Sequence, residues 1–282
     1  MARHDLHAFR RRRVAFRGVR VLACVATFLV CFAARVPAAR AADGEPGAPQ
    51  TQGVPPPPAP SAADFLFGAP RAWLSLRGSL LFPRAGGDLF AFVSDQLTVD
   101  KTDLRARGFA ADVGAVLTPS VDLVVGFDLT RRDTGSEYRR FVASNAQPIT
   151  QFTRLQQSAL SVGVRATPFG RGRRISRYAF IPKRVVPYGG AGLAISHYDF
   201  SQRGQFVDFA DLSIFNDRFV SNGWSVGPYV HGGADVQVWK RLSLTFDGRY
   251  TWLHSGLDAD FSGFDGIDLA GFRGGTGISV VF

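Results

Sequence analysis

Ten charged side chains stand at alternating positions within apolar stretches of this sequence, and they are the residues best placed for chemistry. Residues two apart share one face of an extended chain, so these charges project together from the apolar side chains between them. The set comprises Arg77, Arg132, Arg165, Arg249 and Arg273 together with Asp112, Asp122, Asp128, Asp235 and Asp247. Five cations opposite five anions can neutralise one another in a confined space, where unpaired charges are costly. The pattern therefore predicts a network of ion pairs in a narrow interior.

A catalytic interpretation of the same face centres on His231, which shares its parity with Tyr229 and Asp235. Ser225 and Ser243 project the same way, and a serine activated by a histidine base could form a hydrolase site. A polar interior contains many serines for packing reasons alone, so we expect no catalytic site, no enzyme activity and no cofactor.

Residues 258–268, DADFSGFDGID, carry Asp258, Asp260, Asp265 and Asp268. Carboxylates are ligands that Ca²⁺ prefers, but this spacing does not match an EF-hand loop. We expect a solvated acidic surface loop and no metal site.

The charged positions belong to eight stretches with a period of two, which is typical of half-buried β-strands. The stretches lie near residues 73–82, 108–117, 121–129, 159–166, 187–195, 225–238, 242–252 and 272–282. Strands of about 9–11 residues, tilted by about 45°, are long enough to cross a bilayer. The predicted fold is all-β, an eight-stranded antiparallel transmembrane β-barrel over residues 71–282.

The connections alternate in length, as they do when the two ends of a barrel face different compartments. Residues 83–103, 131–150, 199–223 and 254–268 form long polar loops, whereas Thr118–Ser120 and Lys240–Arg241 are tight turns. The exception is the turn over residues 168–185, which holds six Arg and Lys residues and no acid. It could contact an anionic partner, such as phospholipid head groups or a cell-wall polymer, or it could be a mobile solvated loop.

Composition indicates which face of the barrel points outward, because a soluble lipocalin-like barrel alternates too. After residue 41 the chain has three Lys and two Glu, far fewer than a water-facing exterior would carry, so we assign the apolar face to lipid. Amphipathic rings near the strand ends then predict two aromatic girdles at the membrane interfaces. The girdle candidates are Tyr188, Tyr198, Trp224, Trp239 and Trp252.

The first 70 residues differ from the rest. Residues 1–41 combine a basic start, a 14-residue apolar run and Ala39 and Ala41 in an A-x-A arrangement, which predicts a secretory signal peptide cleaved near Ala41. Lipidation at Cys24 is disfavoured because few apolar residues precede it. Residues 42–70 are rich in Pro, Ala and Gly, and we expect a flexible segment there.

The predicted leader also accounts for the high charge. The whole chain has 33 Lys and Arg against 23 Asp and Glu, and residues 1–41 hold nine Arg and one Asp, which leaves 24 against 22. A net charge of +2 gives no indication of nucleic-acid binding. Both cysteines, Cys24 and Cys31, lie in the leader, so no disulfide is expected after cleavage.

The stretch PYGGAGLAISHYDF and the final strand GFRGGTGISVVF resemble those of small eight-stranded outer-membrane β-barrels of the OmpA-like and OmpW-like type. The resemblance covers roughly residues 71–282 and is architectural, so it bears on fold and location more than on activity. It implies that Ile278, Val280 and Phe282 form a terminal signal that is read by the barrel-insertion machinery.

We therefore expect a porin-like cell-envelope protein in the outer membrane of a Gram-negative-type bacterium. Its expected partners are outer-membrane lipid and the insertion machinery, without nucleic acid, and it is expected to be monomeric. A structural or surface-interaction role with a largely closed lumen is the favoured function. The alternatives are a small pore or a binder or transporter of apolar molecules, and a membrane-embedded hydrolase.

Overall fold

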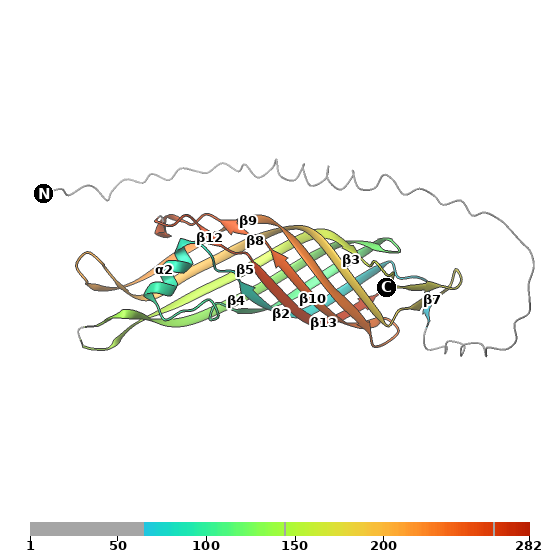
Figure 1. Ribbon diagram of the computed structural model, residues 1–282, viewed down its shortest axis with the longest axis horizontal. Helices are drawn as coiled ribbons and strands as arrows, with labels where there is room; N and C mark the ends of the chain where they lie inside the picture. The colour runs from blue at the N-terminus through green and yellow to red at the C-terminus, as the bar shows by residue number, and fades with distance from the viewer. Residues whose placement is uncertain (1–64, 144, 262) are drawn as a thin grey trace, which may run out of the picture. The chain divides into compact units, whose positions relative to one another are not determined.

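The computed structural model describes residues 65–143, 145–261 and 263–282, which belong to one compact unit (Figure 1). The predicted leader and nearly all of the Pro-rich segment lie outside the described residues. Eight antiparallel strands close into a barrel in the order β10-β13-β2-β3-β4-β5-β8-β9, with β9 paired to β10. The predicted all-β, eight-stranded antiparallel barrel is confirmed.

The strands of the barrel have unequal lengths. They are β2 (Ala72–Pro83), β3 (Ala106–Thr118), β4 (Val121–Val142), β5 (Pro148–Ala166), β8 (Val185–Val207), β9 (Ile214–Gln237), β10 (Leu242–Thr251) and β13 (Gly271–Val281). The seam between β13 and β2 aligns Ile278 with Leu76, and the Phe282 amide donates to the Ala72 carbonyl at 2.8 Å. Closure leaves no sheet edge at the levels of the barrel where all eight strands are present.

The alternation of side chains sets the two faces of the barrel, as β2 illustrates. Leu74, Leu76, Leu80 and Phe82 point outward with 36% to 49% of their surface exposed. Trp73, Ser75, Arg77 and Ser79 point inward and are at most 7% exposed. The outer surface of the barrel is therefore apolar and its interior is polar, the reverse of a soluble domain.

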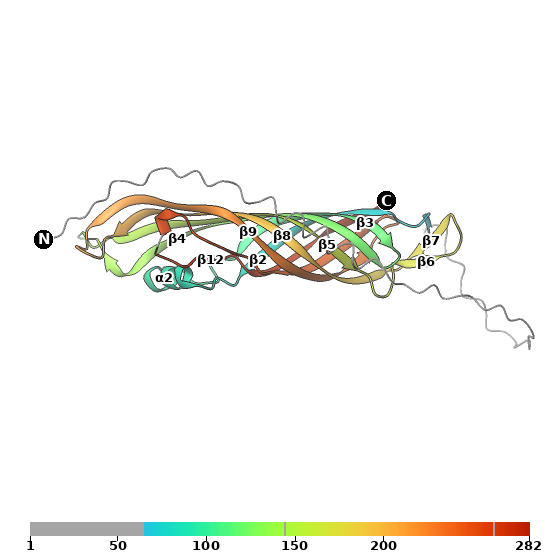
Figure 2. The same ribbon diagram turned by 90° about the horizontal axis from the view of Figure 1, so that it is seen from above.

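We call the two ends of the barrel the turn end and the loop end. The turn end carries the connections over residues 119–120, 167–184 and 238–241, and the loop end carries those over 84–105, 143–147, 208–213 and 252–270. Figures 1 and 2 show that β4, β5, β8 and β9 continue far beyond the other barrel strands toward the loop end.

These four strands correct the prediction of long loops at residues 131–150 and 199–223. β4, β5, β8 and β9 contain 22, 19, 23 and 24 residues, against 12 in β2 and 10 in β10. Both faces of the extension are rich in polar residues, which hid the alternation. A charge pair on its outer face joins β5 to β4, since Asp133 on β4 accepts from Arg154 on β5. Asp133 also accepts from Arg131 of its own strand at 2.9 Å. The Arg154 hydrogen bond, with that of Arg131, lowers the pKa of Asp133.

The loop end is covered by a packed cap rather than by loose loops. It contains α2 (Asp88–Gln96), β11 (His254–Ser255), the 3-10 turn η2 (Ala259–Phe261) and β12 (Ile267–Asp268). α2 begins after Gly87, whose φ of 90° favours glycine, and buries Leu89, Phe90 and Val93 on one face. The core beneath it joins residues from the cap and the extension: Ala85, Leu89, Phe90, Val93, Leu97, Val99, Leu104, Leu155, Tyr198, Phe200, Leu253, Phe261, Ile267 and Leu269.

No helix in the described part of the chain is both long enough and apolar enough to cross a membrane.

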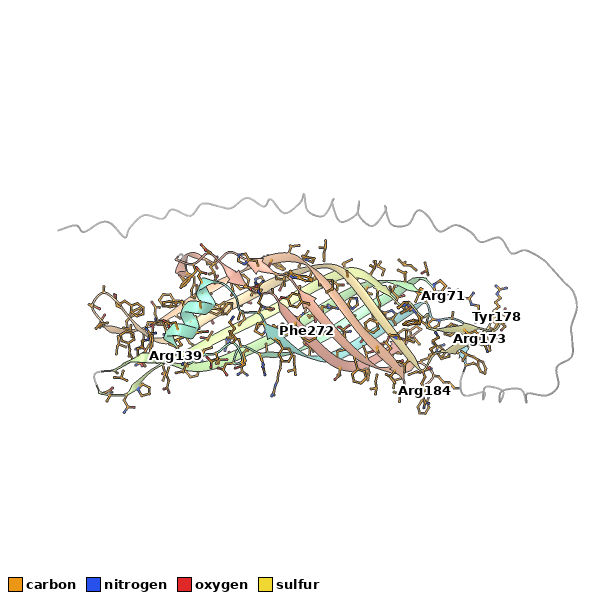
Figure 3. All side chains as sticks on the ribbon, viewed as in Figure 1. Arg71, Arg139, Arg173, Tyr178, Arg184 and Phe272 are labelled. Atoms are coloured by element: carbon orange, nitrogen blue, oxygen red, sulfur yellow. The ribbon has the colours of Figure 1, made fainter. Side chains whose placement is uncertain are left out.

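The turn end carries a second, three-stranded sheet. β1 (Leu66–Phe67) pairs with β7 (Ala179–Pro182), which pairs with β6 (Gly172–Arg174). Part of the segment 168–185, expected to be one long turn, is therefore a hairpin, and it aligns Phe180 with Leu66 from the end of the Pro-rich segment. Figure 3 shows Arg173 and Tyr178 at this end, opposite to Arg139 in the extension.

Phe90→Ala tests whether the cap packs as a separate layer over the barrel. Phe90 is 2% exposed and its ring meets that of Phe200 edge-on at 6.4 Å. Losing a buried phenylalanine costs about 3–5 kcal/mol. We expect chymotrypsin to cleave within residues 84–105 much faster, while the barrel itself should stay folded in mild detergent and shift its gel mobility only after boiling. Phe92→Ala, at a 43% exposed position of the same helix, is the matched control and should have a smaller effect. Equal cleavage rates for wild type and Phe90→Ala would contradict the packed cap.

Candidate functional site

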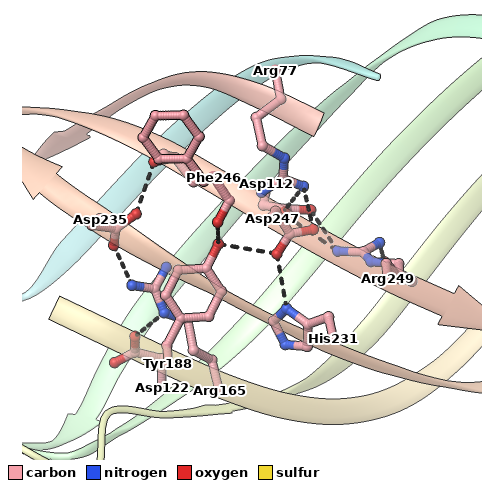
Figure 4. A network of polar contacts seen from close by, with 12 residues as sticks. Arg77, Asp112, Asp122, Arg165, Tyr188, His231, Asp235, Phe246, Asp247 and Arg249 are labelled. Carbon is pink, nitrogen blue, oxygen red and sulfur yellow. Dashed lines mark hydrogen bonds and ion pairs between the residues drawn. The ribbon is translucent and has the colours of Figure 1, made fainter. Parts of the chain in front are cut away.

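The lumen of the barrel is the candidate site because all eight strands direct a polar or charged side chain into it (Figure 4). The charged members are Arg77 on β2, Asp112 on β3, Asp122 and Asp128 on β4, Arg165 on β5, Asp235 on β9, Asp247 and Arg249 on β10, and Arg273 on β13. Their side chains are at most 15% exposed. Charges buried to this degree require partners.

Arg249 lies at the centre of the lumen. Its Nη1 donates to Asp128 Oδ2 at 2.9 Å, and its Nη2 lies 3.4 Å from Asp112 Oδ1. Arg77 contacts the same Asp112 at 2.5 Å and reaches Asp247 at 3.8 Å. Arg77 and Asp112 lie on the neighbouring strands β2 and β3. The other pairs join strands that are not neighbours, so these charges reach across the lumen. Asp235 lies on β9, next to the strand of Arg249, but it pairs with Arg165 instead.

The shared carboxylates extend the network to further strands. Asp128 also faces Arg273 Nη1 at 3.4 Å. Asp247 Oδ2 accepts from the Tyr188 hydroxyl at 3.0 Å and lies 3.4 Å from His231 Nδ1. Each central carboxylate therefore contacts at least two donors, which offsets the cost of removing it from water.

A second cluster lies toward the turn end, around Arg165. Its guanidinium pairs with Asp235 and has Nε 4.0 Å from Asp122 Oδ2. The same guanidinium lies between two aromatic rings, 3.7 Å from the centroid of Tyr188 and 4.6 Å from that of Trp73. Trp73 Nε1 also donates to Asp122 at 2.9 Å. The rings support the planar guanidinium and exclude water from its faces.

The structure does not place all ten predicted charges in this network. Arg132 lies near the loop end, where its Nε donates to the Asp103 carbonyl at 2.6 Å. Arg171, from the turn between β5 and β8, pairs with Asp122 and is the fifth cation of the lumen in place of Arg132. Arg171 belongs to the basic turn over residues 168–185, where period-two alternation gives no information about which way a side chain points.

Gly114 makes room for the indole of Trp73. A Cβ at this position would lie 2.1 Å from Trp73 Cε2, closer than any real contact. Because β3 brings no side chain here, the ring can lie flat in the lumen and reach both Asp122 and Arg165. The alternation predicted that Trp73 and Gly114 face inward but not that they are in contact.

The lumen thus contains equal numbers of buried cations and carboxylates: Arg77, Arg165, Arg171, Arg249 and Arg273 against Asp112, Asp122, Asp128, Asp235 and Asp247. Neutrality lowers the cost of burial, whereas loss of one partner leaves an uncompensated charge. Side chains meeting from opposite walls also occupy the space that a conduction path would need.

The residues considered for catalysis and metal binding are separated. Among the described contacts, His231 pairs with Asp247, while the Ser225 hydroxyl donates to the His254 carbonyl at 2.7 Å. The acidic segment fastens the cap, since Asp258 accepts from the Asn222 amide at 2.9 Å and Asp260 from the Val220 amide at 3.0 Å. No group of three or more possible metal ligands occurs among the described residues.

Two of the girdle candidates are corrected by their burial. Tyr188 stacks in the lumen, and Tyr198 is fully buried in the cap core, where its hydroxyl donates to the Gly256 carbonyl at 2.6 Å. Both have the parity of the inward face, so alternation could have excluded them. Trp224, Trp239 and Trp252 point outward and are 68%, 71% and 45% exposed. Ile278 and Phe282 also face outward on and just after β13.

Arg249→Ala tests the central network. It removes the partner of Asp128 and Asp112, and breaking a buried pair costs about 3–5 kcal/mol. We expect the urea midpoint of the vesicle-reconstituted barrel to fall by a corresponding amount. Adding Asp128→Asn should restore part of the lost stability, because a neutral amide then replaces the carboxylate that Arg249 no longer neutralises.

Arg131→Ala is the matched control for this experiment. Arg131 pairs with Asp133 at 2.9 Å, but the two side chains are 52% and 48% exposed. An exposed pair contributes about 0–1 kcal/mol. If both variants lose the same small amount of stability, Arg249 is not held by buried pairs.

Comparison with known proteins yields distant likenesses only. No protein-family model matches the chain, and neither does any curated protein. The outer membrane protein OprG from Pseudomonas aeruginosa is 10% identical with a TM-score of 0.47, over 77% of this chain and 98% of that chain. Neisserial surface protein A is 13% identical with a TM-score of 0.41, over 75% and 97%. Ail, the attachment invasion locus protein of Yersinia pestis, is 14% identical with a TM-score of 0.39, over 76% and 99%. The assignment of this chain as a closed eight-stranded barrel rests on its own strand pairing.

Proposed function

We propose that the chain spans a bacterial outer membrane as a closed barrel with a structural or surface-interaction role. The observation that carries the proposal is the combination of an apolar exterior with a neutral, charge-filled lumen. In water, the exterior would expose a continuous apolar belt far larger than monomeric soluble proteins tolerate. In lipid, the apolar side chains of the belt contact acyl chains, and the closed part of the sheet pairs its own backbone groups.

The belt has the composition expected of a lipid-facing surface. Every barrel strand contributes exposed apolar residues to it, and Thr276 is an exposed polar residue among them. The apolar members include Leu76, Phe109, Val125, Leu160, Ile195, Val226, Phe246 and Phe272. Trp224 and Trp252 lie near its loop end and Trp239 lies at its turn end, where amphipathic rings are favoured.

Two barriers in series support a closed rather than a conducting barrel. The first is the network around Arg249, and the second is the cap, whose core covers the loop end. The sheet extension and the cap then present a folded surface beyond the membrane. Such a surface suits contact with partners outside the cell better than passage of solutes.

Planar-bilayer recording tests the closed lumen. Wild type should give no conductance steps, because charges bridge the lumen and the cap lies above them. Arg249→Ala combined with Phe90→Ala opens both barriers and should introduce steps, while each single change leaves the other barrier in place. Steady conductance in wild type would refute closure, and recovery of the protein in a soluble fraction would refute the membrane location.

A second candidate function, binding of small apolar molecules, is favoured by a cavity of about 200 Å³ at the loop end. The cavity lies between α2, the ends of β8 and β9, and η2. Aromatic rings dominate its lining, which includes Phe92, Tyr138, Phe206, Phe209, Phe215, Phe219, Phe261 and Phe264. A dry apolar cavity of about 150 Å³ is large enough to bind benzene.

Val207→Trp tests this second function, because Val207 lines the cavity and the much larger indole side chain would fill it. We expect wild type to bind a short alkylbenzene in saturation-transfer NMR and the variant to lose that signal. Phe152→Trp, at a 53% exposed position outside the cavity lining, should bind as wild type does. Equal binding by all three proteins would exclude this cavity as the site.

A further inference from the structure

The excess positive charge of the barrel is concentrated at its turn end. Eight cations lie there: Arg71, Arg173, Arg174, Arg177, Lys183, Arg184, Lys240 and Arg241. No acidic side chain lies among the described residues of that end, from residue 65 to Arg71 and in the connections 119–120, 167–184 and 238–241. The lumen is balanced, and the loop end, with the strand extensions and cap, holds 11 cations against 14 acids.

All eight cations are exposed, and within the described residues none of them forms an ion pair with a carboxylate side chain. Arg171 differs from them, because it turns inward to Asp122. As far as the described residues go, the turn end therefore presents a surface of positive charge without carboxylate side-chain partners, which favours an anionic partner or solvent ions.

Four of these cations are fixed at the border of the apolar belt. The Arg71 amide donates to the Phe282 carbonyl at 2.7 Å, the Arg184 carbonyl accepts from Gln237 at 2.8 Å, and the Arg241 carbonyl accepts from Val281 at 3.0 Å. Lys240 lies beside Arg241 in the same tight turn. The ends of neighbouring strands therefore hold all four at one level of the barrel, and Figure 3 shows Arg71 and Arg184 at this rim.

Apolar side chains share that level. Val185, Val238 and Trp239 are 51%, 58% and 71% exposed next to the rim cations. On the hairpin, Tyr178 stacks on Phe67 with centroids 5.5 Å apart, and Arg177 lies 5.8 Å from the Tyr178 ring. Cations alternating with amphipathic rings match the head-group region of a bilayer, where phosphate and acyl chain meet.

We propose that the turn end binds the phosphate groups of anionic phospholipids in the leaflet that surrounds it. The rim cations Arg71, Arg184, Lys240 and Arg241 contact the head groups, while Val238 and Trp239 contact the upper acyl chains. A soluble polyanion or wall polymer would engage the charge but would leave the adjoining apolar rim exposed. The inference rests on the proposed membrane-spanning function.

Fluorescence quenching by brominated lipids can test this, because tryptophans lie at both ends of the belt. A Trp224→Phe, Trp252→Phe protein retains Trp239 as the lipid-facing reporter at the turn end, and Trp73 stays inside the lumen. Vesicles contain phosphatidylethanolamine and phosphatidylglycerol in one fixed ratio, with the bromine on either lipid at equal mole fraction. We expect quenching of Trp239 to be about twofold stronger from brominated phosphatidylglycerol.

Three controls connect the preference to the rim charges. A Trp239→Phe, Trp252→Phe protein, which reports from Trp224 at the loop end, should show no preference. In the Trp239 reporter, Arg71→Gln, Arg184→Gln, Lys240→Gln and Arg241→Gln together should bring the two quenching levels to equality. Molar salt, at which the Debye length is about 3 Å, should reduce the preference in the unaltered rim. This third control needs no rim substitution, so it applies even if the charge variant assembles poorly.

The outcomes separate the two proposals. Equal quenching of Trp239 by both brominated lipids overturns phospholipid binding at the turn end and leaves the membrane barrel intact. A preference that persists in molar salt also overturns it, because the recognition is then not electrostatic. Absence of quenching by either lipid at both reporters overturns the membrane-spanning function itself.

Discussion

Arg249 can be buried in the middle of the barrel only because carboxylates from other walls reach it. Its guanidinium pairs with Asp128 on β4 and Asp112 on β3. Asp128 also pairs with Arg273, and Asp112 also pairs with Arg77. Removing any member leaves an opposite charge without a partner in a space that excludes water. The register of the strands is therefore constrained on the inside by charge, while the outer face needs only to be apolar. A shift of one of these strands by one residue would turn the charged side chains of that strand outward.

The barrel itself could be predicted from the sequence because period-two alternation is strict in strands with two different faces. All eight strands, their antiparallel order and the inward parity of Arg77, Asp112 and Arg249 follow from it. The pairing did not follow, since alternation says which way a side chain points and not how far it reaches across a lumen. Asp235 lies on the strand adjacent to that of Arg249, yet the long side chain of Arg249 crosses to Asp112 and Asp128 on β3 and β4.

The extension and the cap could not be predicted because their stabilising contacts come from segments far apart in the sequence. The polar residues near Asp133 and Arg154 suggested loops, yet they lie on the outer face of paired strands whose inner face meets α2 and η2. The signal for α2, buried Leu89, Phe90 and Val93, extends over fewer than three turns, too short to stand out among polar residues. Tyr188 and Tyr198 differ, because the sequence did hold the signal for their burial. Their parity placed them on the inward face, while their position near predicted strand ends suggested the membrane interface.

The central ion pairs also link neutrality of the lumen to closure of the barrel. Arg249 bonds to Asp128, 121 residues before it, and to Asp112, 137 residues before it. In any partly formed sheet that lacks β10, Asp128 and Asp112 face an incomplete lumen without their central cation, and water must solvate them. The arrival of β10 and β13 supplies Arg249 and Arg273 and expels that water in the same step. Contacts of such long range are gained late, when most of the entropy of chain ordering has already been lost. The neutral lumen is thus a product of closure, and closure is the stage at which the barrel exchanges a hydrated interior for a protein one.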